Sequence, residues 1–218
     1  MILSFDQVIH RYSGSSEAIE LPSFTLSPGE KILVMGPSGS GKSTLLNLVS
    51  GVQPLQQGDI TLLEHSYANL SARQLDCIRA DHMGVIFQAL NLIPYLNGFD
   101  NAQLGVQFSN KSREQANKSR QEISRIGHRL GLNDEILQKP AQHLSIGQQQ
   151  RVAVIRALLG KPELIIADEP TSALDEYSTD RFMTELMESL DSSKQAVLMV
   201  SHNPRLTSFF DQVVELKS

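Results

Sequence analysis

A glycine-rich loop between a strand pattern and a helix pattern is the feature that most constrains the fold of this 218-residue chain. The apolar run 31–35 is typical of a buried strand, and residues 43–50 carry apolar side chains at helical spacing before a stop at Gly51. The loop matches the pattern G-x-x-x-x-G-K-[ST]. Its residues are Gly36, Pro37, Ser38, Gly39, Ser40, Gly41, Lys42 and Ser43. This strand–loop–helix unit predicts an α/β fold with a phosphate-binding loop.

The residue types of the loop explain the chemistry expected of it. Glycines let the backbone curl so that successive N–H groups face one concavity, and the helix N-terminus behind it favours negative charge. We expect Lys42 to reach the β- and γ-phosphates of a nucleotide, Ser43 to coordinate Mg²⁺ and Thr44 to add a nearby hydroxyl. Kinases, GTPases and many ATPases share this loop, so it predicts a nucleotide ligand and no particular reaction.

The remaining patterns predict strands at both ends of the chain and helices in its middle. The expected strands are 2–9, 19–26, 58–63, 85–87, 164–167, 196–200 and 211–216. The expected helices are 112–132, opened by a capping box of Ser112 and Gln115, then 142–160 and 182–190. The alternation favours a mostly parallel sheet covered on both faces. Within one domain, 1–218, we expect a core at about 1–88 and 162–218 and a helical subdomain at about 89–161.

Composition excludes several classes of protein. The net charge of −5 makes general nucleic-acid binding by charge unfavourable. The single cysteine, Cys77, excludes an internal disulfide and a cysteine-rich zinc site. No apolar run approaches the length of a membrane-spanning helix, and the N-terminus lacks a signal-peptide pattern. We therefore expect a cytoplasmic chain that meets a membrane only through a partner.

Two acids follow the apolar strand 164–167. The carboxyl ends of parallel strands are where ligands bind in open α/β sheets. Asp168 is suited to hold Mg²⁺, directly or through water, and Glu169 to polarise an attacking water. Alone, such acids are often only turn residues, but the upstream phosphate loop favours a catalytic site.

The segment 144–153, Leu-Ser-Ile-Gly-Gln-Gln-Gln-Arg-Val-Ala, resembles the signature sequence of ABC-type ATPases. The other family elements follow in the family's order along essentially the whole chain. They are an aromatic residue at Tyr12, a Q-loop glutamine at Gln88, a D-loop at 172–175 ending in Asp175, and a switch histidine at His202. Ile146 departs from the commonest signature, which has glycine there, but Gly147 is retained.

The resemblance implies the role of each residue. Tyr12 would stack on adenine, Gln88 would touch Mg²⁺ or water, and His202 would hold the attacking water together with Glu169. Ser145, Gly147 and Gln148 would contact the γ-phosphate held by a second copy of the chain, and Asp175 would cross the interface. The resemblance thus implies a head-to-tail homodimer with two ATP molecules at its interface. It also implies a P-loop (RecA-like) core with an N-terminal antiparallel β subdomain and an inserted α-helical subdomain.

The resemblance further implies an ATPase that drives a separate membrane subunit from the cytoplasmic face of the inner membrane. The segments 87–94 and 148–151 resemble the macrolide-efflux and lipoprotein-release subfamily, so export, envelope trafficking or mechanotransmission is expected. One alternative is a soluble ABC ATPase acting on nucleic acid or ribosomes. A second is a P-loop kinase of small molecules, which would leave the signature unexplained. The apolar loop near 88–98 is either a satellite core or the docking groove for the membrane subunit.

Overall fold

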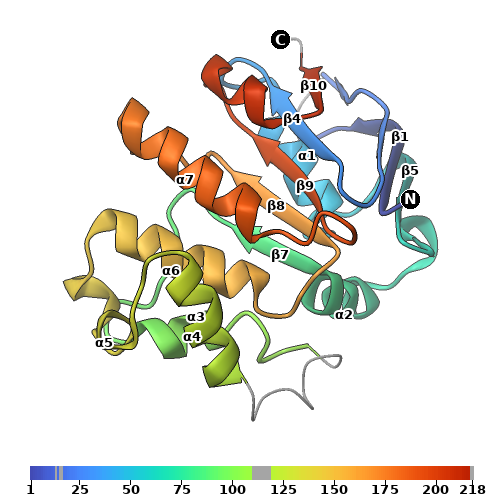
Figure 1. Cartoon of the computed structure of the whole chain (residues 1–218). Helices are drawn as coiled ribbons and strands as arrows, with labels where there is room; N and C mark the ends of the chain where they lie inside the picture. Colours follow the sequence, from blue (N-terminus) through green and yellow to red (C-terminus); the bar gives the residue numbers. More distant parts are fainter. Residues whose placement is uncertain (13, 15–16, 110–118, 217–218) are drawn as a thin grey trace.

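The computed structural model describes residues 1–12, 14, 17–109 and 119–216. Its centre is an all-parallel sheet with the strand order β10-β4-β9-β8-β7 (Figure 1). The strands are β4 (Lys31–Met35), β7 (Met83–Ile86), β8 (Leu164–Asp168), β9 (Ala196–Val200) and β10 (Gln212–Glu215). The carboxyl ends of β4, β8 and β9 therefore meet at one edge, which confirms the expected mostly parallel sheet.

A second, antiparallel sheet carries the N-terminal part of the chain. Its strands are β1 (Leu3–His10), β2 (Ile19–Glu20), β3 (Phe24–Leu26), β5 (Gln57–Leu62) and β6 (His65–Ser66). The prediction of one strand at 19–26 is wrong. β2 pairs with the end of β1 and β3 with its beginning, and Pro22 lies between them, where it can donate no ladder hydrogen bond.

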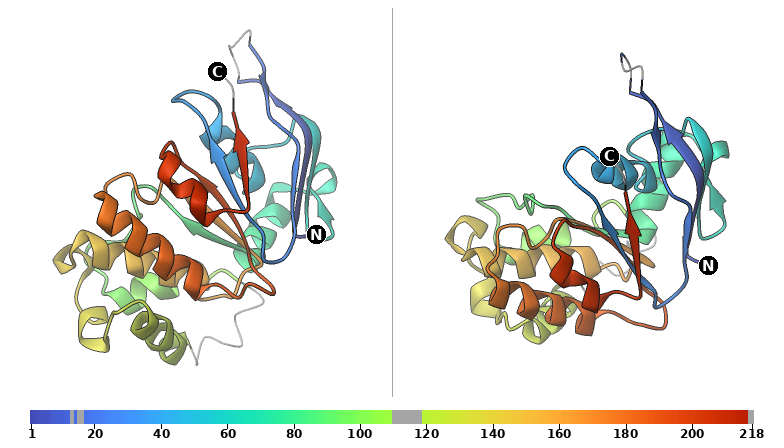
Figure 2. Two further views of the ribbon diagram at one scale, coloured as in Figure 1. Left: turned by 45° about the horizontal axis from the view of Figure 1, so that its top comes forward. Right: turned by 90° about the horizontal axis from the view of Figure 1, so that it is seen from above.

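The parallel sheet separates two hydrophobic cores because its side chains alternate between faces. From β9, Leu198 and Val200 join the core shared with the antiparallel sheet, whereas Val197 and Met199 face the other core. Figure 2 shows this layering, with the antiparallel sheet on one side and the helix-rich segment on the other. The side chains of Val197, Leu198, Met199 and Val200 are all fully buried.

The helices are α1 (Lys42–Val49), α2 (Ala72–His82), α3 (Gly98–Gln103), α4 (Ser119–Arg129), α5 (Asp134–Leu137), α6 (Ile146–Leu158) and α7 (Glu176–Ser189). Four of the helices, α1, α4, α6 and α7, correspond to predicted ones with different boundaries, whereas α2, α3 and α5 were not predicted. Short 3₁₀ turns span Tyr67–Asn69, Ala141–His143 and Pro204–Phe209. The side chains of Ser145 and Asp175 cap α6 and α7, so α6 begins later than expected and α7 earlier. The predicted capping box of Ser112 and Gln115 lies outside the described residues.

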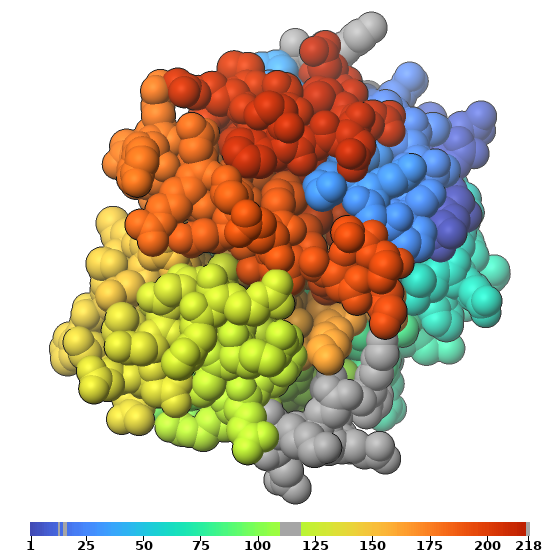
Figure 3. Space-filling model, viewed as in Figure 1, coloured from blue at the N-terminus to red at the C-terminus, as the bar shows by residue number. Residues whose placement is uncertain are grey.

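The helices α3, α4, α5 and α6 form the helix-rich segment, which packs onto the central sheet through α6. α7 lies against α4 in the space-filling view, where the orange and yellow-green segments meet (Figure 3). Buried side chains of α4 and α6 join those of β8 and α7 in one hydrophobic cluster. The division near residues 89 and 161 stays a prediction. Within the described ranges, no helix is both long and apolar enough to cross a membrane.

Candidate functional site

A cleft of about 640 Å³ opens at the carboxyl edge of the parallel sheet. Its lining comes from segments far apart in the sequence. The lining residues are Tyr12, Ile19, Ser38, Gly39, Gly41, Lys42, Ser43, Thr44, Gln88, Asp168, Glu169 and His202. The fold thus gathers the predicted phosphate loop, both strand-end acids, the glutamine and the histidine around one space.

The phosphate loop follows β4 and leads into α1. Gly39 and Gly41 have φ of 85° and 96°, and the left-handed region favours glycine because it lacks a Cβ. Lys42 Nζ donates to the carbonyl oxygens of Gly36 (2.7 Å) and Pro37 (2.9 Å), so the ammonium spans the loop. An ammonium has three N–H donors, and among the residues that the structure describes two carbonyls are bonded to that of Lys42, which leaves one donor for a ligand.

Glu169 is held in a special backbone conformation directly after β8. Its φ is 43°, although it is not glycine, and its N–H donates to the carbonyl of Val200 at the end of β9 (3.0 Å). Ser201 Oγ donates to one carboxylate oxygen of Glu169 (3.1 Å), and His202 Nδ1 lies 2.9 Å from the other. The carboxylate is buried, whereas the imidazole is mostly exposed. Sequence reasoning missed Ser201, whose only signal was its place at the end of a strand.

The neighbouring carboxyl, Asp168, is electrostatically strained. Burial raises the pKa of Asp168, the nearby charge of Glu169 raises it further, and the charge of Lys42 lowers it. Two acids at adjacent positions therefore have different surroundings. A bound cation would relieve the repulsion between them.

Tyr12 and Gln88 lie at the rim of the cleft. The Tyr12 side chain is 46% exposed, and its hydroxyl lies 2.8 Å from Thr44 Oγ1 at the start of α1. Its ring meets His10 edge-on, with centroids 4.9 Å apart. Gln88 Nε2 donates to Ser172 Oγ at 3.5 Å, so the loop after β7 touches the segment that leads to α7.

The signature residues do not lie in this cleft. Ser145, Gly147 and Asp175 line a separate groove of about 440 Å³ between the N-terminal ends of α6 and α7. Ser145 and Gln148 form the capping box of α6: Gln148 N donates to Ser145 Oγ (3.3 Å), and Ser145 N donates to Gln148 Oε1 (3.0 Å). The exposed side chains of Ile146 and Tyr177 flank the groove.

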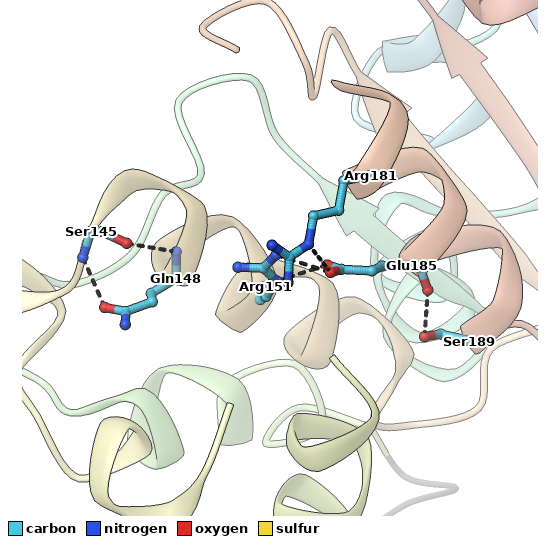
Figure 4. A network of polar contacts seen from close by, with 6 residues as sticks. All are labelled: Ser145, Gln148, Arg151, Arg181, Glu185 and Ser189. Atoms are coloured by element: carbon cyan, nitrogen blue, oxygen red, sulfur yellow. Dashed lines mark hydrogen bonds and ion pairs between the residues drawn. The ribbon is translucent and has the colours of Figure 1, made fainter. Parts of the chain in front are cut away.

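A salt-bridge network fixes α6 against α7 beside this groove (Figure 4). Arg151 donates from Nε and Nη2 to the two oxygens of Glu185 (2.7 and 3.0 Å), and Arg181 Nε donates to the same carboxylate (2.8 Å). Burial works to raise the pKa of Glu185, but the two guanidinium groups lower it more. A bidentate pair with shared charges resists rotation of α6 relative to α7.

The cleft has the donor set for a magnesium–nucleotide complex. The hydroxyl of Ser43, the carboxylate of Asp168 and the amide oxygen of Gln88 are hard oxygen ligands, which suit Mg²⁺. The backbone N–H groups of the loop, the N-terminus of α1 and the free donor of Lys42 suit phosphate oxygens. Chemically, the Glu169–His202 pair can orient a water molecule beside a phosphate.

Comparisons with known proteins point to one family. The family model "ABC transporter" matches residues 19–172. The macrolide export ATP-binding/permease protein MacB of Pasteurella multocida (strain Pm70) is 32% identical over 219 residues, which cover 99% of this chain and 33% of that protein. The lipoprotein-releasing system ATP-binding protein LolD of Hyphomonas neptunium (strain ATCC 15444) is 33% identical over 216 residues, covering 99% of this chain and 93% of that protein.

The fold also matches solved structures. A dimeric structure of a post-hydrolysis state of the ATP-binding cassette MJ0796 bound to ADP and Pi superimposes with a TM-score of 0.83. Its sequence is 32% identical, and the match covers 99% of this chain and 94% of that one. The expected fold class is confirmed. This chain spans only a third of the length of the MacB relative.

Proposed function

The chain belongs to the ABC transporter family, and we propose that it is the ATP-hydrolysing motor subunit of a transporter, working on a membrane-spanning partner. The relatives named for macrolide export and lipoprotein release support an export or envelope-trafficking system. Attachment to the cytoplasmic face of the inner membrane through that partner is part of the proposal.

One observation carries the ATPase assignment: Glu169 and His202 are hydrogen-bonded in a cleft that also holds the phosphate loop. Glu169 would accept the hydrogen bond of the attacking water, because its carboxylate is buried and lines the cleft. His202 would hold that water and the γ-phosphate. The hydroxyl of Ser201 holds the Glu169 carboxylate in place by donating a hydrogen bond to it.

The other cleft residues would bind and orient the nucleotide. Residues 36–43 and Lys42 would hold the phosphates, and Tyr12 would stack on adenine, a contact of about 1–3 kcal/mol in comparable base–aromatic pairs. Ser43, Asp168 and Gln88 would hold Mg²⁺, which when bound neutralises charge that develops on the phosphates. The electrostatic strain at Asp168 supports this assignment.

The separate position of the signature groove supports a dimer. Ser145, Gly147 and Gln148 lie outside the cleft of their own chain, yet the N-terminus of α6 is suited to an anion. Two chains arranged head to tail would place each groove over the partner's nucleotide. Asp175, which caps α7 beside the groove, would lie at that interface.

The loop 88–98 divides between the two roles expected of it. Leu92 packs against the hydrophobic core formed by α4, α6, β8 and α7, so its role is structural, whereas Tyr95 is 76% exposed. Asn101 is fully buried and donates to the carbonyls of Ile93, Leu96 and Asn97, so it shapes the loop from below. We assign Tyr95 and its neighbours to the docking surface for the membrane partner.

The docking surface is tested by Tyr95→Ser, which should abolish formation of the complex with the membrane partner and leave the basal ATPase rate unchanged. Phe108→Ser, a control at an equally exposed aromatic residue, should leave complex formation intact.

The proposed ATPase is tested by Glu169→Gln. Glutamine keeps the shape of the side chain but loses the basic oxygen, so ATP should bind with an affinity near wild type while phosphate release falls at least about 100-fold. The control Glu188→Gln makes the same chemical change on the exposed side of α7 and should leave both values unchanged. Equal turnover in Glu169→Gln and wild type would remove Glu169 from the mechanism.

A further inference from the structure

Two consecutive residues just after Gln88 have left-handed backbone conformations without being glycine. Leu90 has φ 57° and Asn91 has φ 47°. Asparagine tolerates this region, but leucine rarely adopts it, because its Cβ crowds the backbone. Such a conformation persists only where surrounding contacts hold it. The loop that carries Gln88 therefore needs an external support.

The guanidinium of Arg156 provides that support. Its Nη2 donates to the carbonyl of Leu90 (2.6 Å), and its Nη1 donates to the carbonyl of Asn91 (2.7 Å). The same group lies 5.8 Å from the centroid of the Phe87 ring. The donors of a planar guanidinium form a rigid fork, so Arg156 fixes the two neighbouring carbonyls in a more defined geometry than the rotatable ammonium of a lysine would.

Arg156 makes these contacts in an environment that disfavours its charge. Burial lowers the pKa of Arg156, and within the described ranges no carboxylate forms an ion pair with it. Arg151, one and a half turns earlier on α6, instead pairs with the carboxylate of Glu185. Among the described residues, the hydrogen-bond acceptors of this half-buried cation are carbonyl groups, and such a pairing is best explained by the backbone shape that it enforces.

The position of Arg156 links two distant sites. It lies in the last turn of α6, and Ser145 and Gly147 lie at the first turn of the same helix. The helix has 13 residues and is thus about 20 Å long. Its C-terminal end is tightly packed, since a Cβ at Gly105 would lie 2.2 Å from the carbonyl oxygen of Arg156. Because Arg156 also holds the carbonyls of Leu90 and Asn91, a displacement of α6 at the signature groove would move the loop.

We propose that Arg156 is a positioning residue that clamps residues 87–91 to α6 and so sets the place of Gln88 beside the nucleotide cleft. The expected effect on kcat rests on the proposed ATPase function, whereas the clamp itself rests only on the contacts of Arg156. Arg156 touches no reacting group; it acts through the loop. The clamp makes the signature helix and the loop of Gln88 one mechanical unit within a single chain.

Hydrogen exchange tests the clamp without nucleotide. The amides of Leu90 and Asn91 donate to the carbonyls of Phe87 (3.0 Å) and Ala89 (2.6 Å), so they report on the loop's shape. In Arg156→Gln, exchange of these two amides should accelerate at least about tenfold, with Arg156→Lys intermediate. The matched control is Arg129→Gln, which removes another arginine-to-carbonyl contact, from α4 to Glu188 of α7, and should leave the loop unchanged.

A kinetic split and a rescue distinguish positioning from a general loss of structure. In Arg156→Gln, kcat should fall about tenfold or more while the Kd for ATP stays within about twofold, because the phosphate loop is untouched. Adding Leu90→Gly should recover part of the kcat, since glycine adopts a positive φ without support.

The outcomes separate the clamp from the ATPase proposal. Unchanged exchange at Leu90 and Asn91 in Arg156→Gln would overturn the clamp, as would acceleration spread evenly over α6 and β7, which marks a purely structural arginine. If the wild-type protein had no ATPase activity, but Arg156→Gln still accelerated exchange at Leu90 and Asn91 alone, the proposed function would be contradicted and the clamp supported. Altered exchange with wild-type kcat would overturn the positioning of Gln88.

Discussion

The cleft and the signature groove, which we propose face nucleotides from two different chains, are built in opposite ways. The cleft draws its residues from segments across the whole chain, and these groups hold one another: Lys42 spans its loop, and Glu169 is fixed by Ser201 and His202. The groove is built from the starts of two helices, and its polar groups are satisfied locally by capping.

The difference indicates which surface works alone. The cleft has the ammonium of Lys42, hard oxygen ligands and a candidate general base, so it is suited to bind and orient a nucleotide within one chain. The groove has none of the phosphate-loop groups and is flanked by exposed apolar side chains at Ile146 and Tyr177. We propose that it is a half-site that a second copy completes. The predictions below test this division.

The largest effect is expected at Lys42. Lys42→Ala removes the ammonium that spans the loop and would contact the β- and γ-phosphates. ATP affinity should fall at least about tenfold and hydrolysis at least about 100-fold, measured by nucleotide titration and phosphate release. Near-normal turnover would rule out the phosphate-loop assignment.

Ser145→Arg should separate hydrolysis from binding. The substitution fills the groove with a bulky cation, so phosphate release should fall about 100-fold. ATP affinity of the isolated chain should remain within about twofold of wild type, because the cleft lies elsewhere. If Ser145→Arg weakened ATP binding as much as Lys42→Ala does, the signature would belong to the pocket of its own chain.

The smallest effect concerns the stability of the empty cleft. Burial and the charge of Glu169 raise the pKa of Asp168, so the folded chain holds this proton more tightly than the unfolded chain. Ionisation of Asp168 therefore costs stability as the pH rises from about 4, the ordinary range of aspartate, through the raised pKa. Asp168→Asn removes this cost.

Without nucleotide or metal, Asp168→Asn should melt about 2 °C higher than wild type near neutral pH, and the difference should shrink as the pH falls towards 4. Calorimetry at several pH values checks this. A lower melting temperature in the variant at neutral pH would show that the carboxylate is stabilising in the empty cleft. ATP hydrolysis should nevertheless be lost, because the amide is a poorer ligand for Mg²⁺.

The elements that the sequence predicted well have a local signal. The loop 36–43 combines glycines with a strand before it and a helix after it, and the acids at 168 and 169 end an uninterrupted apolar run. The capping box of Ser71 and Gln74 that opens α2 was missed, because no apolar periodicity accompanies it. Among its eleven residues only Ile78 is buried, so no apolar stripe marks it as a helix.

What the sequence did not reveal depends on contacts between distant segments. Ser201 matters because β8 and β9 are neighbours, which brings its hydroxyl to Glu169. Arg156 looks like any arginine at the end of an apolar helix until the loop at 90–91 is seen beside it. The positive φ of Glu169 and Leu90 has no sequence signature, because glutamate and leucine are not residue types that indicate a left-handed backbone, as glycine is.

The central claim, that each active site combines one chain's cleft with the other chain's groove, is tested most directly by mixing two inactive variants. Lys42→Ala has an intact groove and Ser145→Arg an intact cleft, so a mixed dimer contains one complete site and one doubly altered site. Phosphate release should be near background for each variant alone and should recover to about a quarter of the wild-type rate in an equimolar mixture, because half of the dimers are mixed and each has one of two sites. A mixture that stays as inactive as its components would contradict the head-to-tail arrangement.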